Sequence, residues 1–181
     1  MKKLIALLLL CIVAAPAWAD KYDDTIATFR KSPATHEFFR NAYGYAVFPI
    51  IGKGGIGVGG AYGEGRVYRQ GKYVGDARLA KLTIGWQLGG QAFSEIIFFQ
   101  DKRAFDEFTS GSFEFGAGAS AVAITLGTEA QASTVGQSAN AGDKQVSAGY
   151  YKGMAVFTHV TGGLMYEAAI GGQTFSYTPR K

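Results

Sequence analysis

The chain has 181 residues, of which 48% are hydrophobic and 18% are charged, and its formal net charge is +4. This length is sufficient to bury one full core, and so small a positive charge excludes the basic character of most nucleic-acid-binding proteins. The single cysteine, Cys11, excludes internal disulfides, and the chain after residue 19 has no cysteine for a nucleophile or thiolate metal site.

Residues 1–19 have the pattern of a secretory signal peptide. Two lysines precede an apolar run from residue 4 to residue 15, and Ala17-Trp18-Ala19 has the small-x-small form of a signal peptidase site. A membrane anchor is the alternative, but the apolar run falls short of the about 20 residues that span a bilayer as a helix. We expect a mature chain that begins at Asp20, is secreted through this signal and lies in the periplasm, free or peripheral on the membrane.

Residues 20–181 are expected to form one domain. Without residues 1–19, which contain two lysines, the 18 basic residues fall to 16 against 14 acidic residues, a net charge of +2. The 26 glycines stand mostly among apolar and aromatic neighbours rather than in serine-rich tracts, which excludes a flexible-linker composition. No stretch resembles a linker between two cores.

The segment Asp20–Ala42 is predicted to be helical. Apolar residues fall at Tyr22, Ile26 and Phe29, which is the spacing of one helix face, and acidic residues in the first turn complement the helix dipole. Ser32-Pro33 then supplies an N-cap and a first-turn proline for a second short helix. We expect the first helix to pack on a sheet, with a membrane-surface helix as the alternative.

Residues 50–65 read IIGKGGIGVGGAYGEG, and Gly52, Gly54 and Gly57 have the G-x-G-x-x-G spacing of a dinucleotide-binding loop. Such a loop leads directly into a helix, whereas from Gly55 to Arg66 small residues alternate with larger ones at a period of two. This alternation predicts a strand and no nucleotide site. One face of the strand has almost no side chains, so we expect a backbone or an aromatic ring to approach it closely.

The remaining elements are predicted from turn, strand and capping patterns. Gln70-Gly71 is expected to turn the glycine-rich strand back, placing Tyr68 opposite Tyr73. Asp101 caps a short helix that is stopped by Gly111. Further strands are expected at 82–99 with a bend at Gly89-Gly90, at 112–126, and near 145–158, 163–170 and 172–178, with a loop over 127–144.

Together these elements predict an α+β fold. Many short strands and tight glycine contacts indicate a strongly curved antiparallel β-sheet or barrel-like sandwich. Short helices are expected to pack on the sheet, with a helical segment at the N-terminus.

No catalytic constellation is visible in the sequence. His36 and His159 stand alone and are expected to be structural. A buried carboxylate pair would be needed for hydrolysis, and the carboxylates in strand-like runs are Glu64, Glu95, Glu114 and Glu167. We expect a protein that is not an enzyme and has no cofactor or metal, with a carboxylate-dependent hydrolase as a less favoured alternative.

Basic residues are concentrated around the predicted turn. Between positions 53 and 81, six basic residues stand against two acidic ones, a surplus of +4, with tyrosines between them. Such a surface suits an anionic headgroup, although charges that protect edge strands from aggregation are the alternative interpretation. The residues expected to bind lipid are Lys53, Arg66, Arg69, Lys72, Tyr73, Arg78 and Lys81.

Several stretches resemble the signature blocks of the SYLF domain family. They are AYGYAVFPIIGKGGIGVGGAYGEGRVY at 42–68, GWQLGGQAFSEIIFF at 85–99, GSFEFGAGAS at 111–120 and YKGMAVF at 151–157. The resemblance implies a non-enzymatic lipid-binding module, whose eukaryotic members bind phosphoinositides and, in some cases, actin filaments. Phosphoinositides and actin filaments are not expected in the bacterial envelope, outside the cytoplasm. We therefore carry over only anionic phospholipid as the ligand class.

The resulting hypothesis is a glycine-rich protein of the bacterial cell envelope that binds anionic phospholipid as a peripheral membrane protein on the periplasmic side. A structural or scaffold protein of the envelope with a protein partner is the alternative.

Overall fold

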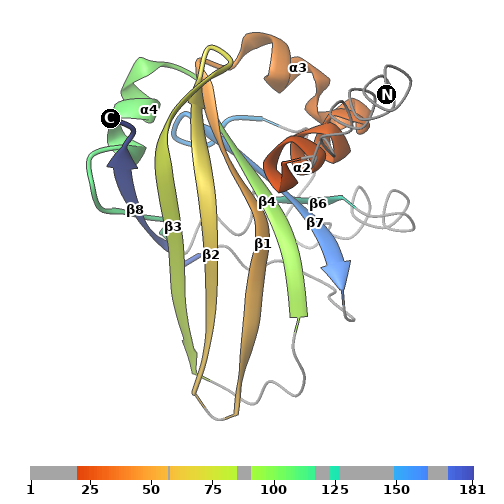
Figure 1. The fold of residues 1–181 in the computed structure, drawn as a ribbon, viewed down its shortest axis with the longest axis vertical. Helices are drawn as coiled ribbons and strands as arrows, with labels where there is room; N and C mark the ends of the chain where they lie inside the picture. Colours follow the sequence, from red (N-terminus) through yellow and green to blue (C-terminus); the bar gives the residue numbers. More distant parts are fainter. Residues whose placement is uncertain (1–19, 57, 85–90, 117–122, 127–148, 163–170) are drawn as a thin grey trace, which may run out of the picture.

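The computed structural model describes residues 20–56, 58–84, 91–116, 123–126, 149–162 and 171–181. Two helices precede four long strands, and a short helix and four further strands follow (Figure 1). The elements are α2 (Lys21–Arg30), α3 (Pro33–Asn41), β1 (Gly44–Ile56), β2 (Val58–Arg69), β3 (Lys72–Ile84), β4 (Gln91–Phe99), α4 (Lys102–Phe108), β5 (Phe113–Glu114), β6 (Ile124–Leu126), β7 (Met154–Gly162) and β8 (Thr174–Pro179).

All of these strands belong to one eight-stranded sheet with the order β5-β8-β3-β2-β1-β4-β7-β6. Neighbouring strands are antiparallel except β6 and β7, which are parallel. The sheet curls strongly into a half-barrel (Figure 1). The predicted α+β fold, with a curved antiparallel sheet, short helices on it and a helical N-terminal segment, is therefore confirmed.

The two faces of the sheet bury different cores. The inner, concave face carries Phe48 and Phe99 and is covered by Phe105 and Phe108 of α4. The outer face carries a second cluster, in which apolar side chains of α2 and α3 meet those of β1, β2, β4 and β7. Because strand side chains alternate between the two faces, each residue's parity decides which core it joins.

The N-terminal helices form as predicted. The Asp20 side chain caps α2 by accepting a hydrogen bond from the backbone N–H of Tyr22 at 3.1 Å, and Ser32 precedes Pro33 at the start of α3. Tyr22, Ile26 and Phe29 are all buried against the sheet. The apolar face of α2 is therefore occupied inside the protein, which confirms packing on the sheet rather than on a membrane surface.

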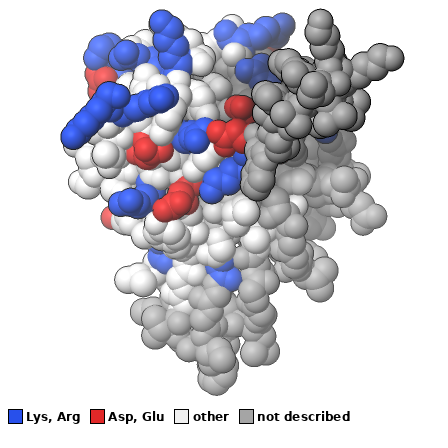
Figure 2. Space-filling model, in the orientation of Figure 1, with Lys and Arg blue, Asp and Glu red and all other residues white. Residues whose placement is uncertain are grey.

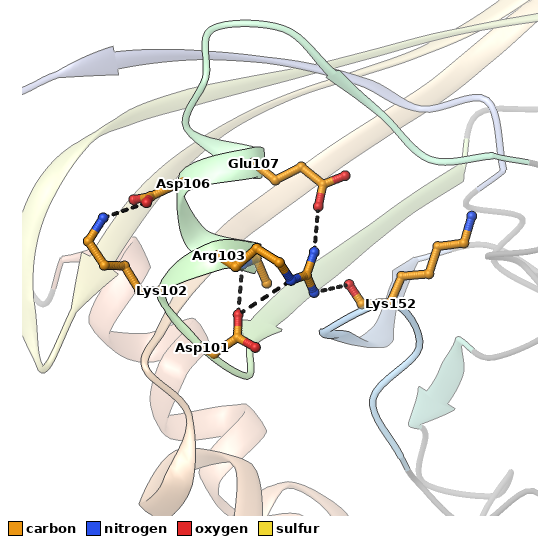
Figure 3. Close-up of polar contacts among 7 residues, drawn as sticks. Asp101, Lys102, Arg103, Asp106, Glu107 and Lys152 are labelled. Atoms are coloured by element: carbon orange, nitrogen blue, oxygen red, sulfur yellow. Dashed lines mark hydrogen bonds and ion pairs between the residues drawn. The ribbon is translucent and has the colours of Figure 1, made fainter.

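Helix α4 is capped at its first turn and is hydrogen-bonded to a turn that is distant in the sequence (Figure 3). Asp101 Oδ1 accepts a hydrogen bond from the backbone N–H of Ala104 at 2.8 Å, as predicted for an N-cap. Arg103 donates to Glu107 at 3.0 Å and to the carbonyl oxygen of Lys152 at 3.1 Å. The second bond ties the helix to the turn that precedes β7.

The predicted hairpin turn is confirmed at Gln70-Gly71. Both residues have positive φ angles, 49° and 78°, as a two-residue turn between twisted antiparallel strands requires. Tyr68 lies directly opposite Tyr73 in the register of β2 and β3. Hairpin geometry thus prevails here over the low preference of glutamine for this position.

Two predicted strands are divided differently in the structure. The run from Gly55 to Arg66 is not one strand, because β1 ends at Ile56 and β2 begins at Val58, with Gly55 opposite Gly59. A strand, not a helix, follows the glycine motif, which contradicts a dinucleotide loop. The alternation of glycines in the sequence continues from β1 into β2, so the pattern alone does not reveal where one strand ends and the next begins.

The predicted strand 112–126 is also wrong as a single element. Its described parts, β5 and β6, lie at opposite edges of the sheet, where they pair with β8 and β7. Phe113 and Phe115 pack in the inner core, whereas Ile124 and Leu126 pack against the outer one, and one short strand does not reach both. The expected loop at 127–144, the strand at 163–170 and the bend at Gly89-Gly90 lie outside the described residues.

A β-bulge in β1 changes which side chains face inward. Between Val47 and Ile51 the pairing with both β2 and β4 shifts by one residue, around Pro49 and Ile50. Proline has no N–H to donate to a sheet, so a bulge is one of the few places in a central strand that accepts it. Beyond the bulge, the odd-numbered residues Ile51 and Lys53 point inward.

The glycine-rich face of β2 is closely packed, as predicted. A methyl group added at Gly65 would lie 2.5 Å from the Phe48 ring, and one at Gly63 would lie 2.7 Å from the Ile51 side chain. The absence of side chains on β2 therefore lets large residues of β1 lie across it, inside the curve of the sheet.

We predict that Gly65→Val destabilises the fold by about 2 kcal/mol or more, because the added side chain overpacks against Phe48. Gly52→Val is the matched control, since a methyl group at Gly52 would contact nothing within 4 Å. Urea denaturation of both variants measures the difference. Equal stability of the two variants would show that the inner face tolerates side chains at this position.

Candidate lipid-contacting site

The structure separates the predicted lipid-binding residues into three places. Arg69, Lys72 and Tyr73 lie at the end of the β2–β3 hairpin, Arg66 and Arg78 lie on the outer face, and Lys53 and Lys81 lie on the inner face. Figure 2 shows Lys and Arg side chains gathered toward the hairpin end of the displayed face, with acidic side chains among them. The sequence cluster is therefore not one surface patch.

A groove lies at the hairpin end of the sheet. It has a volume of about 500 Å³. Its lining combines cationic side chains with apolar and aromatic ones: Arg69, Tyr73, Val74, Phe105, Tyr177, Arg180 and Lys181. We call it the hairpin groove.

Strand β8 brings the last basic residues to the hairpin groove. Its register sets Pro179 opposite Gly75, and the backbone N–H of Arg180 donates to the carbonyl of Val74 at 2.9 Å. The Arg180 guanidinium lies 4.7 Å from the centre of the Tyr73 ring. Sequence reasoning missed Arg180 and Lys181, because only the pairing of β8 with β3 connects them with the hairpin.

Tyr73 is held in a defined orientation within the groove. Its hydroxyl donates to Asp76 Oδ1 at 2.6 Å, and this hydrogen bond raises the pKa of the tyrosine. Its ring contacts the cations of Arg66, at 4.9 Å, and Arg180. The groove can therefore present Arg69, Arg180 and Lys181 to an anionic oxygen beside a fixed aromatic ring.

Arg66 acts as an internal anchor. It forms a salt bridge with Asp20, the N-cap of α2, and its guanidinium lies 4.1 Å from the centre of the Tyr22 ring. Burial alone would lower the pKa of Arg66, but hydrogen bonds to Asp20 and Tyr68 outweigh burial and raise it. These contacts hold the first helix on the sheet, so we leave Arg66 out of the lipid-contacting set. Arg78 is exposed, with Glu64 and Ser176 as its neighbours across the strands.

The inner face contains a fully buried carboxyl group. Glu95 on β4 is 0% exposed, and its Oε2 accepts a hydrogen bond from Nε2 of Gln173 at 3.1 Å. Burial raises the pKa of Glu95 to about 8, while the Gln173 hydrogen bond and the charge of Lys81 act in the opposite direction. Glu95 is therefore mostly protonated at neutral pH.

The carboxylate pair that hydrolysis would require is not formed by the described candidates. Glu64 and Glu114 are exposed, whereas Glu95 is buried with a carboxamide as its partner. Glu167 lies outside the described residues. His36 contacts the carbonyl oxygen of Arg30, at 3.0 Å. Within the part of the chain that the structure describes, no cluster of three His, Cys, Asp or Glu side chains could hold a metal ion.

The described helices also bear on membrane association. None of those in the described ranges combines the length and the apolar character that a membrane-crossing helix needs.

Comparison with known proteins identifies the family. A family model described as "Ysc84: Las17-binding protein actin regulator" matches residues 80–176. The chain belongs to the Ysc84 (SYLF domain) family. This family is associated with lipid binding and is generally non-catalytic, and the match confirms the resemblance found in the sequence.

A curated relative of this Ysc84-family chain is "Beta cell expansion factor A" from Aeromonas veronii. The two sequences are 30% identical over 155 residues, which make up 83% of this chain and 51% of the relative. The chain thus spans about half the length of that protein.

We predict that the buried acid makes stability depend on pH. Because the pKa of Glu95 is raised from its ordinary 4.5 to about 8, its protonation contributes stability that is fully present below pH 4.5 and is lost progressively as the pH rises toward 8. The slope in this window reaches about 1.4 kcal/mol per pH unit. Glu95→Gln, whose carboxamide does not ionise, should remove this component.

Urea denaturation of wild type and Glu95→Gln at a series of pH values between 4.5 and 8.5 provides the measurement. The difference between the two profiles isolates Glu95 from other titrating groups. Parallel profiles of stability against pH for the two proteins would contradict a protonated, uncharged Glu95.

Proposed function

We propose that this chain is a non-enzymatic protein that binds anionic phospholipid at the periplasmic side of the bacterial envelope. The observation that carries the proposal is the hairpin groove, where Arg69, Arg180 and Lys181 stand beside tyrosine and phenylalanine side chains. Membership of a family associated with lipid binding supports the same ligand class.

The composition of the groove suits the headgroup region of a membrane. Arginine pairs with phosphate oxygens through two parallel N–H donors, and lysine adds a point charge. Tyrosine is favoured at membrane interfaces, where its ring meets apolar groups and its hydroxyl meets water. Lys72, exposed beside the turn, extends the positive surface next to the groove.

The location and extent of the domain are part of the proposal. The signal-like residues 1–19 support export to the periplasm, with residues 20–181 as one lipid-binding domain. Las17 and actin appear in the description of the family, and beta cell expansion in the name of the relative. We carry none of these activities over to this chain, because the hairpin groove itself favours a phosphate headgroup.

We predict that Arg69→Glu combined with Lys72→Glu weakens binding to phosphatidylglycerol vesicles by at least tenfold at low salt. Each basic residue near an anionic surface contributes about 1 kcal/mol, and reversal adds repulsion. The loss should shrink with added salt, since the Debye length falls from about 10 Å at 0.1 M to about 3 Å at 1 M. Vesicle flotation with varied headgroups and salt measures both effects.

The matched control is Lys31→Glu combined with Arg40→Glu, which changes the net charge equally at the exposed C-cap of α2 and at an exposed position of α3. This variant should keep most of the wild-type binding. Equal loss in both double variants would attribute binding to net charge alone, and full binding of the hairpin variant would remove the groove from the site.

A further inference from the structure

Large apolar side chains are exposed on the outer face of the sheet, away from the hairpin groove. Ala61 on β2 and Leu79 on β3 are buried in the inner core. Because strand side chains alternate, Tyr62 and Leu82 point outward, and they are 54% and 86% exposed. Helices α2 and α3 lie near the hairpin end of the sheet, and β2 and β3 continue beyond them (Figure 1). Exposed apolar groups gathered on a folded domain mark a surface for interaction.

The outward-facing rows across β2 and β3 each combine opposite properties, either a large side chain with a small one or an anion with a cation. The three rows are Gly60 with Leu82, Tyr62 with Ala80, and Glu64 with Arg78. We call these residues the outer patch. A methyl group added at Gly60 would contact one backbone oxygen and no described side chain within 4 Å, so this position is open to a side chain from outside.

The outer patch is self-complementary under a two-fold axis that runs along the strands, midway between β2 and β3. Such an axis exchanges the two strands, so β2 of one copy faces β3 of the second copy. The large side chains of β2 and β3 in one copy then lie over the small residues of the second copy, Tyr62 over Ala80 and Leu82 over Gly60. Strands of the two sheets run in the same direction, as in aligned sheet packing.

The charges of the outer patch favour a second copy over a membrane. Glu64 accepts a hydrogen bond from the Tyr62 hydroxyl at 3.3 Å. Within the described residues, neither Glu64 nor Arg78 forms a salt bridge, although the two lie opposite each other. An anionic membrane would repel one of these charges as it attracts the other. The two-fold axis instead places Arg78 of each copy over Glu64 of the other, so both charges meet an opposite charge.

The size of the outer patch indicates a weak association. Three rows about 7 Å apart, on three or four strands about 4.8 Å apart, cover on the order of 300 Å² per copy. A standard interface buries about 800 Å² per partner, so this one belongs with weak and transient contacts. The outer face is convex, and α2 lies beside Arg66 at the hairpin end of the patch, which restricts the contact to these rows.

We propose that two copies of this chain form a weak symmetric dimer through the outer patch. Because the two-fold axis runs along the strands, the hairpin ends of both copies point in the same direction. The dimer would therefore bring two hairpin grooves to one membrane, and simultaneous binding at both would strengthen attachment. This last consequence rests on the proposed lipid binding, whereas the dimer itself does not.

Sedimentation velocity tests the dimer on protein that is expressed from the full chain and purified as the host cell processes it. Wild type should change from monomer to dimer as its concentration rises from about 10 μM to about 1 mM. Leu82→Lys should weaken dimerisation at least tenfold, because it removes the apolar contact over Gly60 of the second copy. Circular dichroism melts confirm that each variant is folded.

Exchange of charges tests the two-fold arrangement. Glu64→Arg and Arg78→Glu should each weaken dimerisation at least tenfold, because like charges then face each other across the axis. An equimolar mixture of these two variants should restore dimerisation to within threefold of wild type, because each copy supplies the charges that the other lacks. The matched controls, Lys31→Glu and Glu114→Arg, make the same changes in net charge at exposed positions outside the patch and should stay within twofold of wild type.

The proposal is overturned if wild type stays monomeric over the whole concentration series, if folded Leu82→Lys dimerises as well as wild type, or if the mixture of charge variants stays monomeric. A monomeric wild type together with loss of vesicle flotation by folded Leu82→Lys would instead assign the outer patch to a membrane surface. The sedimentation experiments contain no lipid. Failure of the hairpin groove in vesicle flotation therefore leaves the dimer standing, and the reverse also holds.

Discussion

The hydrogen bond between Glu95 and Gln173 crosses the concave face of the sheet. It joins β4 to the residue that precedes β8, although β1, β2 and β3 lie between those strands in the sheet. A flat sheet would keep these side chains far apart, so the bond requires the curl. The ring contact between Phe48 and Phe175, at 5.6 Å between ring centres, spans the same concavity. Polar and aromatic contacts thus fix one curvature together.

That curvature depends on the absence of side chains at two glycines of β2. Glycine at 63 and 65 allows Ile51 and Phe48 to lie against the backbone of β2, and the sheet bends around them. Strand pairing then determines what lies at each place on the curved sheet. Strand β8 pairs with β3, so Arg180 and Lys181 lie at the hairpin groove. The register of β1 and β3 with β2 places Lys53 and Lys81 on the inner side of the curve.

Local features of the fold were predictable because their signals are local. The cap at Asp101, the helix-face spacing of Tyr22, Ile26 and Phe29, and the turn at Gln70-Gly71 all depend on interactions within a few residues. The candidate site was only partly predictable, because its parts meet through strand pairing. Gln173 is 78 residues from Glu95, and Arg180 reaches Tyr73 only through the β3–β8 register. A charge count along the chain also does not distinguish the two faces of a strand.

The bulge at Pro49 and Ile50 has a consequence for insertions and deletions. It reverses the in-and-out alternation of β1 at its midpoint, so the first half of the strand and the second half follow opposite parities. Removing one residue there, without changing any residue's chemistry, would turn Lys53 toward solvent and leave Lys81 without its neighbour across Ala61. The register of the strand, as much as the identity of its side chains, therefore determines which residues lie on the concave surface.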